Sequence, residues 1–338
     1  MTADPSERRL PDAIGAVPGR PEGGGDASPS YVAAGRPPTA TGGPGPLPIG
    51  PRVLAWGERT YVMGIVNVTP DSFSGDGLAD RPDPAAAAVE LATAMVAAGA
   101  DLVDVGGESS RPGHDPVAAD EERRRVVPVI EAIRAALPGT PISVDTVKPS
   151  VAEAAIAAGA DLLNDVWGVA GDPALARVAA QAGVPLVVMH NRAEAAYRNV
   201  VAEVVADLEQ GLERAVAAGV PWEHLIVDPG VGFGKAPAHN LVLLRGLGAL
   251  RLLGRPVLLG TSRKSTLGKV LDLPPEERLE ATLATTALGI AAGVDIVRVH
   301  DVGPNVRAAR MADAIVRGGH PIETGREPRR GAIPPGDR

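Results

Sequence analysis

The sequence Met63-Gly64-Ile65-Val66-Asn67-Val68-Thr69-Pro70-Asp71-Ser72-Phe73-Ser74 sets the pattern that decides the fold. Its first residues belong to the apolar run Tyr61–Val66, which has the length and the β-branched content of a buried strand. The chain turns polar at Asn67, and Pro70 cannot continue a strand because it lacks a backbone N–H. The segment therefore predicts a buried strand that brings hydrogen-bonding groups to one rim of a sheet. A surface turn would give this pattern once, whereas seven further predicted strands end in the same way.

An Ala-rich helical segment that ends in Gly precedes most of these strands. The glycine is typical of a helix end, because it adopts the left-handed conformation that turns the chain back toward a sheet. The helix ends with this signature are Ala97-Ala98-Gly99, Ala157-Ala158-Gly159, Ala182-Gly183, Ala217-Ala218-Gly219 and Ala291-Ala292-Gly293. The predicted strands are Tyr61–Val66, Ala100–Val105, Ile142–Asp145, Ala160–Asn164, Val184–Met189, Leu225–Asp228, Pro256–Gly260 and Val294–Val299.

This alternation of strand and helix indicates parallel strands with helices outside them. The strands are apolar on both faces, as buried parallel strands are. Eight such units fit a (β/α)8 TIM barrel, and Arg52–Trp56 is predicted to form an N-terminal β-hairpin with Thr60–Val66. An open doubly wound sheet is the alternative. It is less favoured because no Gly-x-Gly-x-x-Gly follows the first strand.

Composition limits the class of protein and its partners. The 338 residues are 45% hydrophobic and 22% charged, with no Cys and a net charge of −8. These values are typical of a globular protein without disulfides, and we expect no nucleic-acid partner, no membrane partner and a cytoplasmic location. Residues 1–50 contain ten Gly and ten Pro without apolar periodicity, so we expect a disordered tail there. Residues 321–338 are predicted to form a second flexible tail, which leaves 51–320 as the folded domain.

Polar side chains stand at the ends of all eight predicted strands, where barrels of this type build their active sites. A single Asp or Asn after a strand is usually a helix cap, but capping needs only one short side chain per helix. The groups together include carboxylates and amides suited to a polar heterocycle, and cations suited to an anion. In strand order they are Asn67; Asp104, Glu108 and Arg111; Asp145; Asn164 and Asp165; His190 and Asn191; Asp228; Ser262, Lys264 and Ser265; Arg298 and His300.

Two residue types, Phe and Lys, are scarce in this chain, and their positions are informative. The only Phe residues, Phe73 and Phe233, lie in polar loops rather than in the predicted core. Lys is also rare, and the four lysines among 33 basic residues are Lys148, Lys235, Lys264 and Lys269. Where Arg is the usual cation, a Lys indicates a place that needs a compact ammonium. Codon drift explains Lys148 and Lys269 equally well.

The motifs at these strand ends, taken in order, resemble those of the dihydropteroate synthase family. After Met63–Ser74, the matching segments are Asp104-Val105-Gly106-Gly107-Glu108-Ser109-Ser110-Arg111-Pro112-Gly113, Ser143-Val144-Asp145-Thr146, Asn164-Asp165-Val166, Met189-His190-Asn191-Arg192, Asp228-Pro229-Gly230-Val231-Gly232-Phe233-Gly234-Lys235, Gly260-Thr261-Ser262-Arg263-Lys264-Ser265 and Arg298-Val299-His300-Asp301. The first, second and seventh motifs are long and specific. The resemblance covers the whole predicted domain and implies the same barrel fold, usually as a homodimer.

The resemblance also implies a reaction and a set of roles. Members of the family join 4-aminobenzoate to the methylene group of a hydroxymethyl-dihydropterin diphosphate and release pyrophosphate, with Mg²⁺. The implied pterin-binding residues are Asp145, Asn164, Asp228 and Lys264. The implied diphosphate-binding residues are Asn67, Arg298 and His300, with Asn67 also the ligand of the metal. The implied walls and anchor of the aminobenzoate site are Phe73, Arg111, Pro112, Phe233 and Ser265. Among all these, the four implied catalytic residues are Asn67, Lys264, Arg298 and His300.

Two other functions fit parts of the sequence. A non-catalytic pterin-binding paralogue would share the fold, but it has no need of Asn67, Arg298 and His300 as a diphosphate clamp. A folate-dependent methyltransferase on a related barrel would not need the Ser262–Ser265 stretch or the loop around Arg111 and Pro112. Mg²⁺-dependent release of pyrophosphate separates the first alternative from an active synthase.

Overall fold

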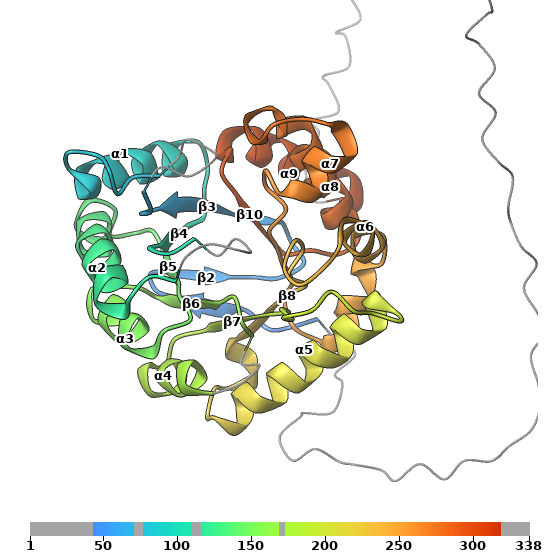
Figure 1. The fold of residues 1–338 in the computed structure, drawn as a ribbon, viewed down its shortest axis with the longest axis horizontal. Coiled ribbons are helices and arrows are strands. Elements are labelled where there is room, and N and C mark those ends of the chain that lie inside the picture. The colour runs from blue at the N-terminus through green and yellow to red at the C-terminus, as the bar shows by residue number, and fades with distance from the viewer. Residues whose placement is uncertain (1–42, 71–76, 110–115, 169–172, 319–338) are drawn as a thin grey trace, which may run out of the picture. The chain divides into compact units, whose positions relative to one another are not determined.

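Eight parallel strands form the central sheet of the computed structural model, which describes residues 43–70, 77–109, 116–168 and 173–318 (Figure 1). The strands are β3 (Tyr61–Asn67), β4 (Leu102–Gly106), β5 (Ile142–Asp145), β6 (Leu162–Asp165), β7 (Leu186–Met189), β8 (Leu225–Asp228), β9 (Leu258–Leu259) and β10 (Ile296–Val299). Their order in the sheet is β8-β7-β6-β5-β4-β3-β10-β9. A parallel bridge between Val227 and Val257 joins the two ends of this order. The predicted (β/α)8 barrel is therefore confirmed, and the open doubly wound alternative is wrong.

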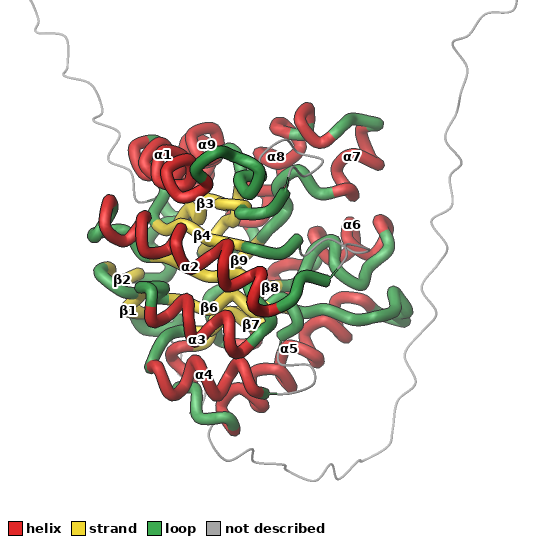
Figure 2. Tube along the Cα trace, turned by 60° about the vertical axis from the view of Figure 1, so that its left-hand side comes forward, coloured by secondary structure: helices red, strands yellow, loops and turns green. Residues whose placement is uncertain are grey.

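Helices lie outside the ring of strands and connect one strand to the next (Figures 1 and 2). The α-helices are α1 (Pro84–Ala97), α2 (Ala119–Ala136), α3 (Pro149–Ala157), α4 (Ala174–Ala182), α5 (Val200–Ala217), α6 (Pro237–Arg245), α7 (Ser265–Leu271), α8 (Leu279–Ala291) and α9 (Val302–Val316). Short 3₁₀ turns are η1 (Trp222–His224), η2 (Leu247–Leu253) and η3 (Pro275–Glu277). Within the described ranges, no helix is both long and apolar enough to cross a membrane.

The glycines predicted to end helices adopt the left-handed conformation. Their φ angles are +103° at Gly99, +114° at Gly159, +70° at Gly183, +103° at Gly219 and +96° at Gly293. A side chain at these positions would be strained, so the repeated Ala-Gly signature reflects a backbone requirement. Each such turn returns the chain to the sheet and starts the next strand in register.

The N-terminal hairpin is present, but it uses different residues from those predicted. Strand β1 (Leu47–Ile49) pairs antiparallel with β2 (Arg52–Leu54), while Tyr61–Asn67 belongs to the barrel. The connection is the two-residue turn Gly50-Pro51, with Gly50 at φ +52°, as short hairpins prefer. The predicted pairing of Arg52–Trp56 with Thr60–Val66 is wrong, because parallel pairing with β10 and with β4 occupies both edges of β3.

The hairpin also moves the predicted start of the folded domain. Leu47 and Ile49 are 1% and 0% exposed, so the folded region begins before residue 51. The rest of the predicted N-terminal tail, residues 1–42, lies outside the described residues, as does 321–338. Their disorder stays a prediction.

The core has an inner and an outer layer. Apolar side chains from the strands meet the hairpin at the N-terminal end of the barrel, and the members of this inner cluster are Leu47, Ile49, Leu54, Tyr61, Met63, Leu102, Leu162, Val187, Ile226, Leu258 and Ile296. A larger outer cluster fills the space between strands and helices. The hairpin thus covers the apolar end of the barrel, which leaves the opposite end for polar groups.

Shortening Ile49 tests this role of the hairpin. Ile49→Val is expected to lower the free energy of unfolding by about 0.5–1.5 kcal/mol, because it removes one buried methylene group from the inner cluster. Val53→Ala is a matched control on the same hairpin, since Val53 is 64% exposed. Its effect should stay within about 0.5 kcal/mol. Urea unfolding measures both values, and equal losses in the two variants would contradict the covering role.

Candidate active site

The pleat of the strands explains why apolar and polar layers alternate inside the barrel. Residues two apart on a strand face the same side. Leu102, Leu162, Ile226 and Ile296 belong to the inner apolar cluster. The residues two positions further along are Asp104, Asn164, Asp228 and Arg298. Each of these four strands thus places an apolar side chain low in the barrel and a polar one at its C-terminal end.

Arg298 is the centre of this polar layer. Its Nε donates to Asp104 Oδ2 over 2.6 Å, and its Nη2 donates to Asp145 Oδ2 over 2.9 Å. Asn164 Nδ2 donates to the same Asp104 oxygen over 3.3 Å. Four separate strands therefore contribute to one connected group. The structure brings Arg298 and Asp145 into direct contact, although the sequence placed them in separate diphosphate and pterin sites.

Burial and charge oppose each other in this group. Burial raises the pKa of Asp145, and the Arg298 guanidinium lowers it only in part. For Arg298 burial lowers the pKa, but Asp104 and Asp145 outweigh it and raise the pKa above its usual value. Arg298 therefore stays cationic and compensates two carboxylates that water scarcely reaches.

Asp228 and Lys264 form a second polar pair at this end of the barrel. Asp228 Oδ1 accepts a hydrogen bond from Gly230 N over 2.7 Å. Burial raises the pKa of Asp228, opposed by Lys264, and burial lowers the pKa of Lys264 to about 8, opposed by Asp228. The Lys264 ammonium donates to Val231 O and lies 4.5 Å from the centre of the Phe233 ring. A carboxylate, an ammonium and an aromatic face are thus assembled around one point.

The loop after β9 positions Lys264 through a strained residue. Arg263 has φ +57°, a left-handed conformation that is uncommon for a residue with a side chain. Two hydrogen bonds of 3.0 and 2.7 Å to Asp301 hold its guanidinium, and Arg278 Nη1 donates to its carbonyl over 2.9 Å. On the next strand end, His300 Nδ1 lies 2.9 Å from Ser262 Oγ. These contacts fix the loop against the end of β10.

Two adjoining cavities open at this end of the barrel. One, of about 440 Å³, is lined by Asn67, Asp145, Phe233, Lys264, Ser265, Arg298 and His300, among others. The second, of about 420 Å³, is lined by Asp145, Asn191, Arg192, Phe233 and Lys235, among others. Asp145 and Phe233 line both. Cavities of this size suit small organic substrates.

Most of the predicted site residues within the described ranges converge here. Asn164 and Asp228 do not line either cavity; they are 3% and 5% exposed and contact Asp104 and the Gly230 amide instead. Phe73, Arg111 and Pro112 lie outside the described residues, so their predicted place in the aminobenzoate site is not described by the structure.

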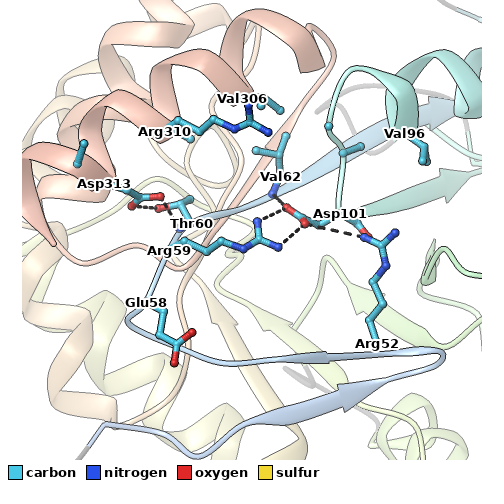
Figure 3. Close-up of a pocket in the computed structure, with 14 residues that line it drawn as sticks. Arg52, Glu58, Arg59, Thr60, Val62, Val96, Asp101, Val306, Arg310 and Asp313 are labelled. Atoms are coloured by element: carbon cyan, nitrogen blue, oxygen red, sulfur yellow. Dashed lines mark hydrogen bonds and ion pairs between the residues drawn. The ribbon is translucent and has the colours of Figure 1, made fainter. Parts of the chain in front are cut away.

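A third cavity, of about 600 Å³, lies at the opposite end of the barrel (Figure 3). Its charged groups are largely paired with one another. Arg59 donates two hydrogen bonds to Asp101 over 3.0 and 2.6 Å. Thr60 donates from its amide and its hydroxyl to Asp313 over 2.7 and 2.8 Å. These pairs tie β3 to α9 and to the turn before β4, and we assign them a structural role.

The sequence interpretation gave no role to two buried groups beside the site. Asp104 is 0% exposed and holds both Arg298 and Asn164. Its position two residues after Leu102 was the available signal, since that spacing puts it on the inner face of its strand. Lys235 is 9% exposed, and the rarity of lysine in this chain was its signal.

Known proteins resemble this chain in sequence and in fold. Residues 63–300 match the family model described as pterin binding enzyme. The dihydropteroate synthase of Bacillus subtilis strain 168 is 51% identical over 269 residues, which are 80% of this chain and 93% of that protein. The crystal structure of the dihydropteroate synthase of Clostridium difficile in the presence of pteroic acid is 49% identical and has a TM-score of 0.74. The match covers 78% of this chain and 98% of the chain in that structure.

One similar protein is described as inactive. The inactive dihydropteroate synthase 2 of Mycobacterium bovis is 44% identical over 271 residues, or 77% of this chain and 84% of that protein. The matches therefore agree on fold and family, and they span the strand ends at which the polar residues converge. This chain belongs to the dihydropteroate synthase family of pterin-binding enzymes.

Proposed function

We propose that this chain is a catalytically active dihydropteroate synthase, which condenses 4-aminobenzoate with 6-hydroxymethyl-7,8-dihydropterin diphosphate. The nitrogen of the aromatic amine attacks the methylene carbon, the bond from carbon to the diphosphate oxygen breaks, and the amine loses a proton to water. Pyrophosphate leaves with the bonding electrons. The observation that carries the proposal is that Asn67, Lys264, Arg298 and His300 line one cavity with Asp145.

Asp145, Asn164, Asp228 and Lys264 are assigned to the pterin ring. A pterin edge alternates hydrogen-bond donors and acceptors, so a site that pairs each of them rejects other rings strongly. The burial of the two carboxylates and the amide supports this assignment, because a buried polar group without a partner is costly. Lys264 adds a donor beside Asp228, and a neutral side chain would not supply its positive charge.

The aminobenzoate ring is assigned to the slot beside Phe233. Phe233 lines both cavities and faces the Lys264 ammonium, which supports its role as an aromatic wall. Ser265 begins α7 and lines the same cavity, so its hydroxyl and amide suit a carboxylate. Phe73, Arg111 and Pro112 are proposed to complete this slot on the strength of their motifs alone.

Arg298 and His300 are assigned to the diphosphate. A guanidinium can bind two phosphate oxygens at once, and the negative charge on the leaving group grows as the bond to carbon breaks. Binding of the diphosphate would give Arg298 a new anionic partner in addition to Asp104 and Asp145. The shared cavity supports a common site for these residues and Asn67.

Mg²⁺ fits this site when the substrate diphosphate is bound there as well. Asn67 offers a side-chain oxygen, and the described residues contain no group of three His, Cys, Asp or Glu side chains that could hold a metal. Mg²⁺ in such sites is commonly held by one or two protein groups, substrate phosphates and waters. The ion would stabilise charge on the diphosphate.

Replacing Asn67 tests the metal assignment. Asn67→Ala is expected to raise the Mg²⁺ concentration that gives half-maximal velocity by about tenfold, because one protein ligand of the ion is lost. The measurement is steady-state release of pyrophosphate across a Mg²⁺ series with 4-aminobenzoate present. An unchanged Mg²⁺ requirement would remove Asn67 from the metal site.

The second candidate is a non-catalytic pterin-binding paralogue, and the inactive relative in Mycobacterium bovis is the observation that favours it. The same assay decides between the two. An active synthase releases pyrophosphate only when 4-aminobenzoate and Mg²⁺ are both present, whereas a paralogue binds the pterin without turnover.

A homodimer and a cytoplasmic location belong to the same proposal. Leu288 on α8 and Met311 and Ile315 on α9 are 68%, 63% and 72% exposed, and these two helices contact each other. Exposed large apolar side chains on two helices that contact each other support an interface between two copies. Sedimentation velocity of the full chain measures the oligomeric state directly. The cytoplasmic location rests on the composition of the chain.

A further inference from the structure

Lys235 lies in the loop between β8 and α6, its side chain is buried, and the proposed chemistry gives it no role. Its Nζ lies 2.9 Å from Gly230 O, 3.0 Å from Phe233 O and 2.8 Å from His190 Nδ1. Burial lowers the pKa of Lys235 to about 7, and the charge of Asp228 opposes this shift. The ammonium form has three N–H donors, so these three acceptors can satisfy it fully. The carbonyl of His190 is a weaker fourth neighbour at 3.5 Å.

The loop that Lys235 contacts packs mainly through its backbone, although the side chain of Val231 is buried in the outer core cluster. Gly230, Gly232 and Gly234 have φ angles of +63°, +89° and +54°. A Cβ atom at Gly230 would lie 1.8 Å from His190 O, and one at Gly234 would lie 2.2 Å from Arg192 O. The loop therefore packs backbone against backbone on the loop after β7. Glycines in such conformations lose much entropy on ordering, so the loop needs hydrogen bonds to fix it.

The protonation of His190 follows from its other neighbours. Its Nε2 lies 3.0 Å from Asp207 Oδ2, which also accepts a 2.7 Å hydrogen bond from Arg192 Nε. A carboxylate paired with an arginine only accepts hydrogen bonds, so Nε2 carries the hydrogen. Burial and the charge of Lys235 lower the pKa of His190 to about 4, which makes the ring neutral. Nδ1 is therefore an acceptor, and Lys235 is its donor.

We propose that Lys235 is a positioning residue, which binds the carbonyls of Gly230 and Phe233 and the His190 ring and so holds Phe233 as the wall between the two cavities. Phe233 is the only loop side chain in this network that lines both cavities within the described ranges. Asp228, in contrast, belongs to strand β8 itself. Lys235 therefore acts on aminobenzoate through Phe233. It acts less on the pterin, which it reaches only through Gly230, whose amide donates to Asp228 Oδ1. The inference rests on the proposed aminobenzoate site.

A split between KM and kcat is the first test. Lys235→Met keeps the apolar stem but removes the three donors, and it should raise the KM for 4-aminobenzoate about tenfold. The kcat and the affinity for a diphosphate-free pterin should change less than about twofold. Lys235→Arg should not restore the KM, because a planar guanidinium cannot aim donors at three acceptors around one point. Lys269→Met is the matched control, since Lys269 is exposed on α7. Equal losses in pterin affinity and aminobenzoate KM would overturn the inference.

A double-mutant cycle tests whether the effect passes through Phe233. Phe233→Ala alone should raise the aminobenzoate KM, and adding Lys235→Met should raise it little further, because the residue being positioned is already absent. Additive effects would overturn the inference. If Lys235→Met does not fold, Lys235→Gln enters the same cycle. It retains two N–H donors, and a smaller rise in KM is expected.

A measurement independent of turnover separates this inference from the proposed function. NMR titration of the His190 ring should show a higher pKa in Lys235→Met than in the unchanged protein, because a neighbouring positive charge is gone. If the unchanged protein releases no pyrophosphate, the proposed function fails, and the His190 titration still tests the network. If it turns over normally but Lys235→Met leaves the aminobenzoate KM unchanged, the positioning role alone is overturned.

Discussion

Arg298→Ala is expected to lower kcat by roughly 10²–10³, the scale seen when one oriented charge-stabilising group is removed from an active site. Charge develops on the diphosphate only as its bond to carbon breaks, so a guanidinium at that point stabilises the transition state more than the bound substrate. The measurement is pyrophosphate release at saturating concentrations of both substrates and Mg²⁺. If turnover at saturation stayed intact while binding of a diphosphate-free pterin was lost, Arg298 would belong to the ring site instead.

The contacts of Arg298 add a second consequence that the assay must separate. Removing the guanidinium leaves Asp104 and Asp145 without their cation, and Asp104 is 0% exposed. A buried carboxylate in that state takes up a proton or destabilises the fold. Arg298→Ala should therefore also lower the melting temperature. Arg310→Ala is the control, because Arg310 is exposed and lines the cavity at the opposite end of the barrel. It should leave kcat unchanged.

The barrel could be predicted from the sequence because local signals repeat along the chain. Strand β8, for example, was predicted with the bounds Leu225–Asp228 that the structure gives. The glycines that end the helices were predicted from the turn chemistry alone, and their positive φ angles follow from it. These features depend on neighbours in sequence, which a single chain displays directly.

The predicted position of the hairpin is wrong because the Gly and Pro content of the whole N-terminal region outweighed the turn signal of one short segment. Residues 1–50 are so rich in Gly and Pro that Leu47–Ile49 was included in the tail. The turn Gly50-Pro51 between alternating apolar residues was nevertheless a hairpin signal. Pro48 is tolerated because it points outward on a two-stranded ribbon. The average composition of 50 residues hides a strand as short as Leu47–Ile49.

The partners of the site residues are beyond what one sequence can give. Arg298 and Asp104 are 194 positions apart, and their contact depends on how eight strands close into a ring. The sequence indicated that both stand at strand ends, but it could not show that Arg298 joins a pterin residue, Asp145, to a group with no assigned role. Lys235 is similar, because its acceptors are main-chain carbonyls and a His on a different loop.

The second large effect is expected at Asp228. Asp228→Asn should weaken binding of a diphosphate-free pterin by about 1–3 kcal/mol, roughly 5- to 150-fold. The substituted side chain keeps its shape. Its oxygen can still accept the hydrogen bond from the Gly230 amide, which Asp228 Oδ1 accepts over 2.7 Å. The second carboxylate oxygen becomes an amide nitrogen, which donates hydrogen bonds instead of accepting them. The donors of the pterin edge then face a donor in a buried site.

Two comparisons make this result specific to the ring. Asp272→Asn makes the same chemical change at an exposed residue after α7, in a left-handed conformation that Asn tolerates, and it should leave pterin binding unchanged. Asp228→Ala leaves room for a water that can act as an acceptor, so its loss should be no larger than that of Asp228→Asn. Isothermal titration calorimetry gives each affinity. Binding by Asp228→Asn as tight as by the unchanged protein would remove Asp228 from the pterin site, because no buried carboxylate that pairs a ring donor can become a donor without cost.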